Sequence, residues 1–106
     1  MTKDLTIKQL AGLIMKQAKE KNWGTKPGEV SMGEKIALIH SELSEALNAY
    51  RHGRISGKDG LSEELADAVI RILHLAGIYG IDIEKEVIKK FNANKSRDWD
   101  RLKKSP

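Results

Sequence analysis

Two acidic pairs with the same spacing are the residues of this chain best suited to carry chemistry. Glu42 and Glu45 form the first pair, and Glu64 and Asp67 form the second. A three-residue step turns by roughly 60° around a helix, so the two members of a pair lie on one face, one turn apart. Each of these faces also holds apolar residues, so we expect the carboxylates to point toward a neighbouring helix and not squarely into water.

Four carboxylates that converge from two adjacent antiparallel helices need cations. Like charges at short range repel strongly in a partly buried site, and some of the groups would otherwise be protonated. Mg²⁺ binds carboxylate oxygens and keeps several of its waters, and helical bundles build carboxylate metal sites in this way. We therefore predict a site for Mg²⁺, with Mn²⁺ as a substitute. The alternative is that both pairs are solvated surface residues, as most isolated acidic pairs are.

A second polar cluster lies at the end of the last predicted helix. Lys90, Asn94 and Arg97 follow one another at steps of four and three residues, which places them on one face. Lysine and arginine bind phosphate, and asparagine hydrogen-bonds a phosphate or a sugar hydroxyl. Because the helix dipole alone favours cations near a helix C-terminus, the cluster by itself leaves a binding role and a structural role open.

Hydrophobic periodicity predicts the helices that position these side chains, and it predicts no strand. The expected helices cover about residues 6–21, 32–50, 62–79 and 83–96. Thr6 and Ser31 each begin a capping-box pattern, and Ser62 and Asp82 are the expected N-caps of the last two helices.

Each expected helix has an apolar stripe that should face a core. In the second helix the stripe consists of Ile36, Ile39, Leu43, Ala46, Leu47 and Tyr50. In the third it consists of Leu65, Ala66, Val69, Ile70, Ile72, Leu73 and Ala76, and in the fourth of Ile83, Val87, Ile88 and Phe91. The stripe of the third helix covers nearly half of its circumference, which is typical of a central bundle helix or of a subunit interface.

Length and composition limit the remaining possibilities. The 106 residues suit a single domain over 1–106, with a polar tail from about residue 97. The absence of cysteine excludes disulfides, thiol nucleophiles and cysteine zinc sites. A net charge of +4 is compatible with phosphate ligands but too small to indicate nucleic acid as a partner. No apolar run approaches a membrane span and the N-terminus has no apolar leader, so we expect a cytoplasmic protein without a membrane partner.

The order of these motifs resembles that of the MazG-like nucleoside triphosphate pyrophosphohydrolases, which belong to the all-α NTP pyrophosphatase superfamily with the dCTP pyrophosphatases and dimeric dUTPases. The family signature is E-x-x-E, a variable gap and E-x-x-D. In this chain it reads Glu42-x-x-Glu45, 18 intervening residues and Glu64-x-x-Asp67. The segment Lys90-x-x-x-Asn94-x-x-Arg97 resembles the family's K-x-x-x-N-x-x-R element. The likeness extends over about residues 5–99.

The resemblance implies an all-α, four-helix bundle-like fold that assembles as a homodimer or homotetramer. It implies Mg²⁺-dependent cleavage of a (d)NTP between its α- and β-phosphates by a metal-activated water, giving (d)NMP and pyrophosphate. Both acidic pairs would be metal ligands, with Glu42 or Glu45 as the catalytic base. The basic cluster, Lys90 with Asn94 and Arg97, would contact the substrate.

The chain departs from the family pattern in places. Ser41 precedes the first pair where many members have a further glutamate, and Arg71 lies one turn beyond Asp67, where relatives can carry an aromatic residue. Arg71 either contacts phosphate or pairs with an acidic neighbour. We expect His74 to be packed or hydrogen-bonded and not a ligand, and Trp23 to anchor a loop, with stacking on a base as the alternative.

Two other functions stay open at this point. One is phosphoribosyl-ATP pyrophosphohydrolase activity, which is found in relatives with the same fold and the same kind of acidic site. The other is a non-catalytic helical regulator that binds nucleotide or nucleic acid through its basic face.

Overall fold

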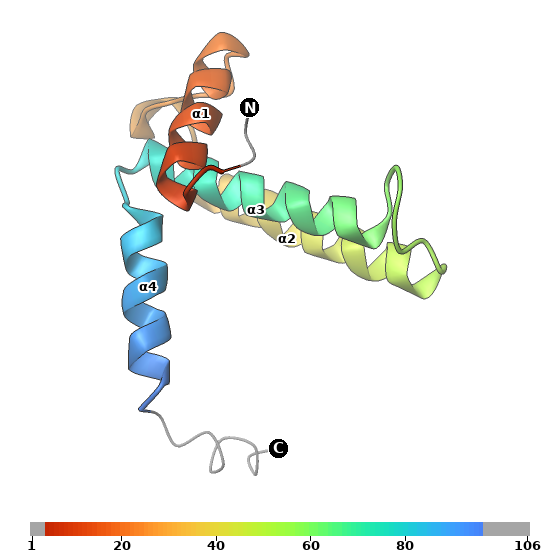
Figure 1. The fold of residues 1–106 in the computed structure, drawn as a ribbon. Helices are drawn as coiled ribbons and strands as arrows, with labels where there is room; N and C mark the ends of the chain where they lie inside the picture. The colour runs from red at the N-terminus through yellow and green to blue at the C-terminus, as the bar shows by residue number, and fades with distance from the viewer. Residues whose placement is uncertain (1–3, 97–106) are drawn as a thin grey trace.

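The computed structural model describes residues 4–96, which form helices joined by loops (Figure 1). The chain forms α1 (Ile7–Glu20), the short 3₁₀ helix η1 (Pro27–Glu29), α2 (Met32–Arg51), α3 (Leu61–Ile78) and α4 (Ile83–Asn94). Within residues 4–96 there is no strand, and no helix is long and apolar enough to cross a membrane. The prediction of an all-α chain with four helices is confirmed.

Side-chain caps begin three of the α-helices at the predicted residues. The Thr6 hydroxyl accepts a hydrogen bond from the Gln9 backbone N–H at 3.1 Å, and the Gln9 side chain accepts from the Thr6 N–H at 2.8 Å. This reciprocal pair is a complete capping box. Ser31 and Asp82 each accept from the backbone N–H three residues further on, which satisfies a free donor in the first turn of α2 and of α4.

The predicted N-cap of α3 is wrong. The cap position is occupied by Gly60, two residues before the predicted one, and the Ser62 hydroxyl donates instead to the carbonyl of Ile55 at 3.1 Å. The loop before α3 returns so closely to the helix that a Cβ at Gly60 would lie 2.6 Å from the carbonyl oxygen of Ser56. Only glycine fits this approach, so the loop and not a side-chain cap fixes where α3 starts.

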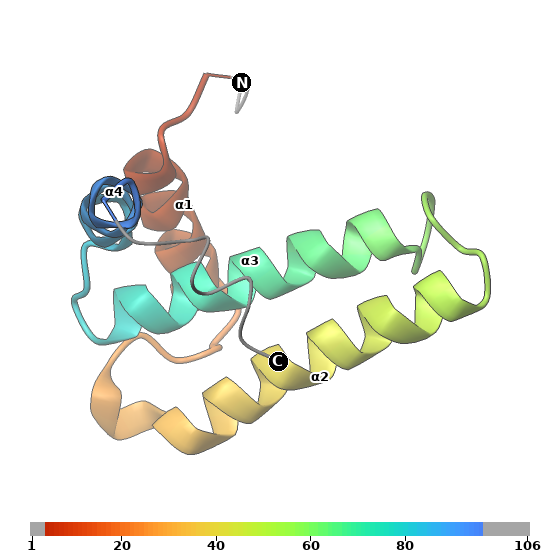
Figure 2. The same ribbon diagram turned by 90° about the horizontal axis from the view of Figure 1, so that it is seen from below.

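An antiparallel hairpin of α2 and α3 is the centre of the fold (Figure 2). α1 packs across α3 at Gly77, where a Cβ would overlap the side chain of Met15. α4 contacts α1 and runs away from the hairpin (Figure 1). The interhelical packing therefore centres on α3, which has α2 and α1 as its neighbours.

Small residues make up most of the core. Its buried apolar members are Ile14, Ala18, Ala46, Ala49, Ala68, Leu73, Ala76 and Ile78. No large side chain in the described part of the chain is fully buried. Alanines let two helices approach closely, but they bury little apolar area, so this chain gains only a modest hydrophobic stabilisation on its own.

The predicted core stripes are wrong for much of α2, α3 and α4. Each of the following side chains is at least 38% exposed: Ile36, Leu43, Leu47, Tyr50, Leu65, Val69, Ile70, Ile72, Val87, Ile88 and Phe91. On α2 the buried residues are Glu42, Ala46 and Ala49, of which only Ala46 belongs to the predicted stripe. Hydrophobic periodicity marks a face that must be covered, but it does not show whether the cover comes from the same chain.

Candidate functional site

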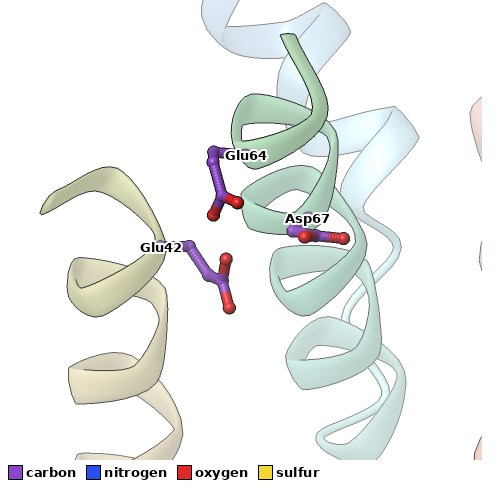
Figure 3. Close-up of side chains that lie close together, drawn as sticks. All are labelled: Glu42, Glu64 and Asp67. Atoms are coloured by element: carbon purple, nitrogen blue, oxygen red, sulfur yellow. The ribbon is translucent and has the colours of Figure 1, made fainter. Parts of the chain in front are cut away.

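Three of the four predicted acidic residues converge between α2 and α3 (Figure 3). One carboxylate oxygen from each of Glu42, Glu64 and Asp67 lies within 4.8 Å of the other two. We term these three residues the acidic cluster. Glu42 of α2 and Glu64 of α3 extend toward each other, and Asp67 lies one turn along α3. Glu42 is 9% exposed and Glu64 5%, while Asp67 is half-buried.

The hairpin geometry explains why the cluster forms. Glu42 shares the buried face of α2 with Ala46, and Glu64 shares the buried face of α3 with Ala68. The alanines one turn further along each helix permit close approach, and the antiparallel pairing sets the two glutamates opposite each other. The prediction that these side chains face a neighbouring helix is confirmed for both glutamates.

Glu45 is not a member of the acidic cluster, although its carboxyl group lies beside that of Glu64. It is exposed, and its carboxylate is not one of the three that converge. It nevertheless acts on Glu64: a hydrogen bond donated to Glu45, burial, the charge of Glu45, a hydrogen bond donated to Glu42 and the charge of Glu42 raise the pKa of Glu64 to about 7. A hydrogen bond between two carboxyl groups requires a proton on one of them, so Glu64 is protonated below pH 7 and loses its proton around neutral pH.

The donor set of the acidic cluster fits a hard divalent cation. Oε2 of Glu42 and Oε2 of Glu64 are buried, and neither has a hydrogen-bond partner among residues 4–96. Buried acceptors without partners are costly, and native structures contain few of them. Oxygen ligands of this kind suit Mg²⁺ or Mn²⁺, and binding would displace the proton of Glu64. The cluster therefore has the chemistry of a cation site without selecting one particular ion.

Arg71 reaches the cluster from α3. Its Nε donates to Oε1 of Glu42 at 2.9 Å, so this ion pair joins α3 to α2. The Glu42 side chain is 12% exposed and the Arg71 side chain 40% exposed. Of the two roles left open by the sequence, pairing with an acidic neighbour is thus observed.

A pocket of about 440 Å³ opens beside the acidic cluster. It is lined by Trp23, Lys35, Glu42, Asp67, Ile70, Arg71 and His74. Carboxylates, two cations and an aromatic ring therefore meet in one cavity, in the combination that an anionic ligand with a flat ring would use.

Trp23 and His74 form the aromatic wall of this pocket. Their ring centroids are 6.1 Å apart with a tilt of 58°, and Trp23 is 42% exposed. His74 is buried, and its Nε2–H donates to the carbonyl of Gly24 at 2.8 Å, which fixes its tautomer. The prediction of a hydrogen-bonded His74 is confirmed. Gly24 has φ +96°, and a Cβ there would collide with Val30, so the loop that holds Trp23 requires glycine.

Lys35 lines the pocket, although no motif in the sequence predicted it. This residue lies in the first part of α2, seven residues before Glu42. Seven residues are two helical turns, so both side chains lie on one face of α2. That spacing is the signal that would have found it.

Lys90 and Asn94 of the predicted basic cluster are not brought to the acidic residues. Lys90 is exposed and Asn94 is half-buried on α4, and neither lines the pocket. Arg97 lies outside the described residues. Because α4 runs away from the hairpin, the roles of all three residues in substrate binding stay predictions (Figure 1).

In comparisons with known proteins, no family model, curated protein or solved structure matches the chain. The resemblance to the MazG-like enzymes therefore rests on the sequence motifs alone.

The raised pKa of Glu64 gives an expected pH dependence of stability in the metal-free protein. Its usual pKa is 4.5, and the folded chain raises this value to about 7. Between these two pH values the folded state binds a proton that the unfolded state has released, so this contribution to stability is present at low pH and is lost as pH rises toward 7. Glu64→Gln, which cannot ionise, should keep its stability over this range.

Urea unfolding in EDTA between pH 4 and pH 8 measures this difference. We expect the stability of Glu64→Gln relative to the wild type to increase between pH 4.5 and pH 7 and to level off above that. A difference that stays constant across the range would mean that the pKa of Glu64 is not raised.

Proposed function

We propose that this chain is a divalent-cation-dependent nucleotide pyrophosphohydrolase that converts a (d)NTP to (d)NMP and pyrophosphate. The observation that carries the proposal is the acidic cluster, whose buried oxygens on Glu42 and Glu64 have no hydrogen-bond partner among residues 4–96. The adjoining pocket adds support, because its cations and aromatic ring suit the phosphates and base of a nucleotide. The resemblance of the acidic motifs to the MazG-like signature specifies the reaction.

Each residue of the site has a separate role in this reaction. The three carboxylates of the acidic cluster would hold the cation. A bound divalent cation would lower the pKa of water and offset phosphate charge. Glu45 is exposed beside the cluster and is not one of the three carboxylates that would hold the cation. We therefore assign Glu45 the role of the general base, which accepts the proton of the attacking water. Lys35 at the pocket wall would bind phosphate, and Trp23 would stack on the base.

The test is a substrate panel with the purified chain. With Mg²⁺ and a series of NTPs and dNTPs, we expect release of pyrophosphate and a nucleoside monophosphate, and no turnover in EDTA. In ¹⁸O-labelled water the label should enter the monophosphate if attack occurs at the α-phosphorus. Release of inorganic phosphate, turnover of phosphoribosyl-ATP alone, or salt-dependent nucleic-acid binding without hydrolysis would each contradict the proposal.

We also propose that the chain self-associates through one side of the hairpin. Leu43, Leu47 and Tyr50 on α2, and Leu65 and Val69 on α3, are all at least 45% exposed. Each directly follows a buried residue, so each is turned by about 100° from the contact between the helices. Because α2 and α3 are antiparallel, this rotation about each helix axis places the residues of both helices on the same side of the hairpin. The five residues, which we term the hairpin face, therefore form one apolar surface.

A second copy is the occupant that best suits this surface. Two antiparallel helices with a shared apolar side make half of a four-helix bundle, and a second hairpin would complete it. The core of the single chain consists largely of alanines, so the hydrophobic area it lacks would come from this contact. The pocket residues Asp67 and His74 are rotated about the α3 axis from Glu64 by about 60° and 80°, in the direction opposite to the hairpin face. A second copy on the hairpin face would therefore leave the pocket open.

A further inference from the structure

Arg71 has more hydrogen-bonding capacity than its ion pair uses. The guanidinium carries five N–H donors, and Nε accounts for one of them in the 2.9 Å contact with Glu42. Within residues 4–96 the side chain makes no other hydrogen bond or ion pair. Its two terminal nitrogens therefore have donors to offer to a ligand, and the 40% exposure of the side chain leaves them accessible.

Arg71 lies at the wall of the pocket. Arg71 lines the cavity together with Glu42 and Asp67, and it lies one turn beyond Asp67 on α3. The ion pair to Glu42 holds the side chain across the gap between the two helices. The orientation of the guanidinium is thus set before any ligand enters, which reduces the entropy lost on binding.

Charge determines which ligand this arrangement can take. The carboxylates that line the pocket repel anions, so an anionic ligand needs cations beside them. Arg71 and Lys35 are the cations that line the cavity. A guanidinium binds phosphate with two parallel N–H···O bonds, whereas an ammonium acts as a point charge. Arg71 is therefore the residue suited to orient a phosphate group beside the acidic cluster.

We propose that Arg71 is a phosphate-binding residue that grips a phosphate group of the ligand with its two terminal nitrogens while its Nε retains Glu42. This inference rests on the proposed function for the identity of the ligand, a nucleoside triphosphate. It makes Arg71 a substrate contact and not only a support for Glu42.

The two roles of Arg71 have opposite consequences for cation binding. A positive charge beside Glu42 competes with a divalent cation for the same carboxylate. Arg71→Gln removes that competition, so binding of Mn²⁺ should become tighter or stay the same, while binding of phosphate becomes weaker. A residue that only positions Glu42 would act differently, because its loss would leave the carboxylate misplaced and weaken Mn²⁺ binding.

Calorimetric titrations of the full chain separate these cases, with Mn²⁺ alone and with the Mg²⁺ complex of inorganic tripolyphosphate as the two probes. For Arg71→Gln we expect tripolyphosphate affinity to fall about tenfold or more, with Mn²⁺ affinity not reduced. Arg71→Lys should fall between this variant and the wild type. Lys16→Gln, which removes an exposed charge from α1, should match the wild type. Thermal unfolding of each variant checks that it is folded.

The inference is overturned if tripolyphosphate affinity is unchanged in Arg71→Gln, if Mn²⁺ affinity falls along with it, or if the wild type does not bind tripolyphosphate. Failure of the proposed function looks different. In that case Arg71 still controls tripolyphosphate binding, but no nucleotide in the substrate panel yields pyrophosphate.

Discussion

Replacing Asp67 by asparagine is expected to reduce the rate of pyrophosphate release by about a hundredfold or more. Asp67 contributes a carboxylate oxygen to the acidic cluster, within 4.8 Å of those of Glu42 and Glu64. Loss of residues that only support metal ligands already costs roughly 10–100-fold in metal affinity or activity, and loss of a ligand should cost at least as much. Asparagine keeps the shape of the side chain and removes its charge. The measurement is kcat/KM at increasing Mg²⁺ concentration.

The matched control for this variant is Glu63→Gln. Glu63 is an exposed acidic residue in the first turn of α3 and lies outside the acidic cluster. It should therefore retain nearly the wild-type rate, although it loses the same charge. Part of the activity of Asp67→Asn should return at high Mg²⁺ if weakened cation binding is the cause. A wild-type rate for Asp67→Asn at all Mg²⁺ concentrations would remove Asp67 from the site.

Val69→Asp is expected to abolish the proposed self-association and leave a monomer. Val69 is 52% exposed in the middle of α3 and belongs to the hairpin face. In a contact between two copies the new carboxylate would be buried without a partner, which is strongly unfavourable. In the single chain it would remain in water, so folding should be preserved. Light scattering after size-exclusion chromatography should give at least twice 11.9 kDa for the wild type and 11.9 kDa for Val69→Asp.

Ser44→Asp is the control for this second prediction. Ser44 is an exposed residue of α2 that lies away from the hairpin face, so the variant gains the same charge outside the proposed contact. It should keep the mass of the wild type. A monomeric wild type, or a Val69→Asp variant with the wild-type mass, would contradict association through this side of the hairpin.

Local signals in the sequence were sufficient to predict the helices. Thr6, Ser31 and Asp82 are N-caps because their side chains accept from backbone N–H groups nearby in the chain, which a sequence pattern can register. The exception at the start of α3 arises from the close return of a loop, in which Gly60 lies against Ser56. That approach depends on the path of the whole loop and leaves only a glycine as its sequence signal.

Which face of a helix is buried was harder to predict. The apolar stripe of α2 that includes Leu43 and Leu47 is exposed, and Glu42 beside it is buried. Hydrophobicity alone assigns the leucines to the core, because it does not weigh a cation or a second chain that would change the balance. The convergence of Glu42 with Glu64 followed from spacing, whereas the exposure of Glu45 depends on the rotation of α2 against α3.

The pairing of Arg71 was decided by geometry across the hairpin. Arg71 and Glu42 are 29 residues apart in the chain, and their contact exists only because α2 and α3 are antiparallel neighbours in this register. The spacing to Asp67 placed Arg71 on the site face, but it did not distinguish a carboxylate partner from a phosphate. Lys35 entered the pocket in the same way, through packing and not through a motif.

The most direct test of the central claim is the location of a divalent cation in a crystal grown with Mn²⁺, by anomalous scattering. We expect a strong peak between α2 and α3, about 2.1 Å from carboxylate oxygens of Glu42, Glu64 and Asp67. The three carboxylates should be drawn together from the 4.8 Å that their oxygens span without an ion. Well-ordered density for these side chains with no anomalous peak between them would contradict the account.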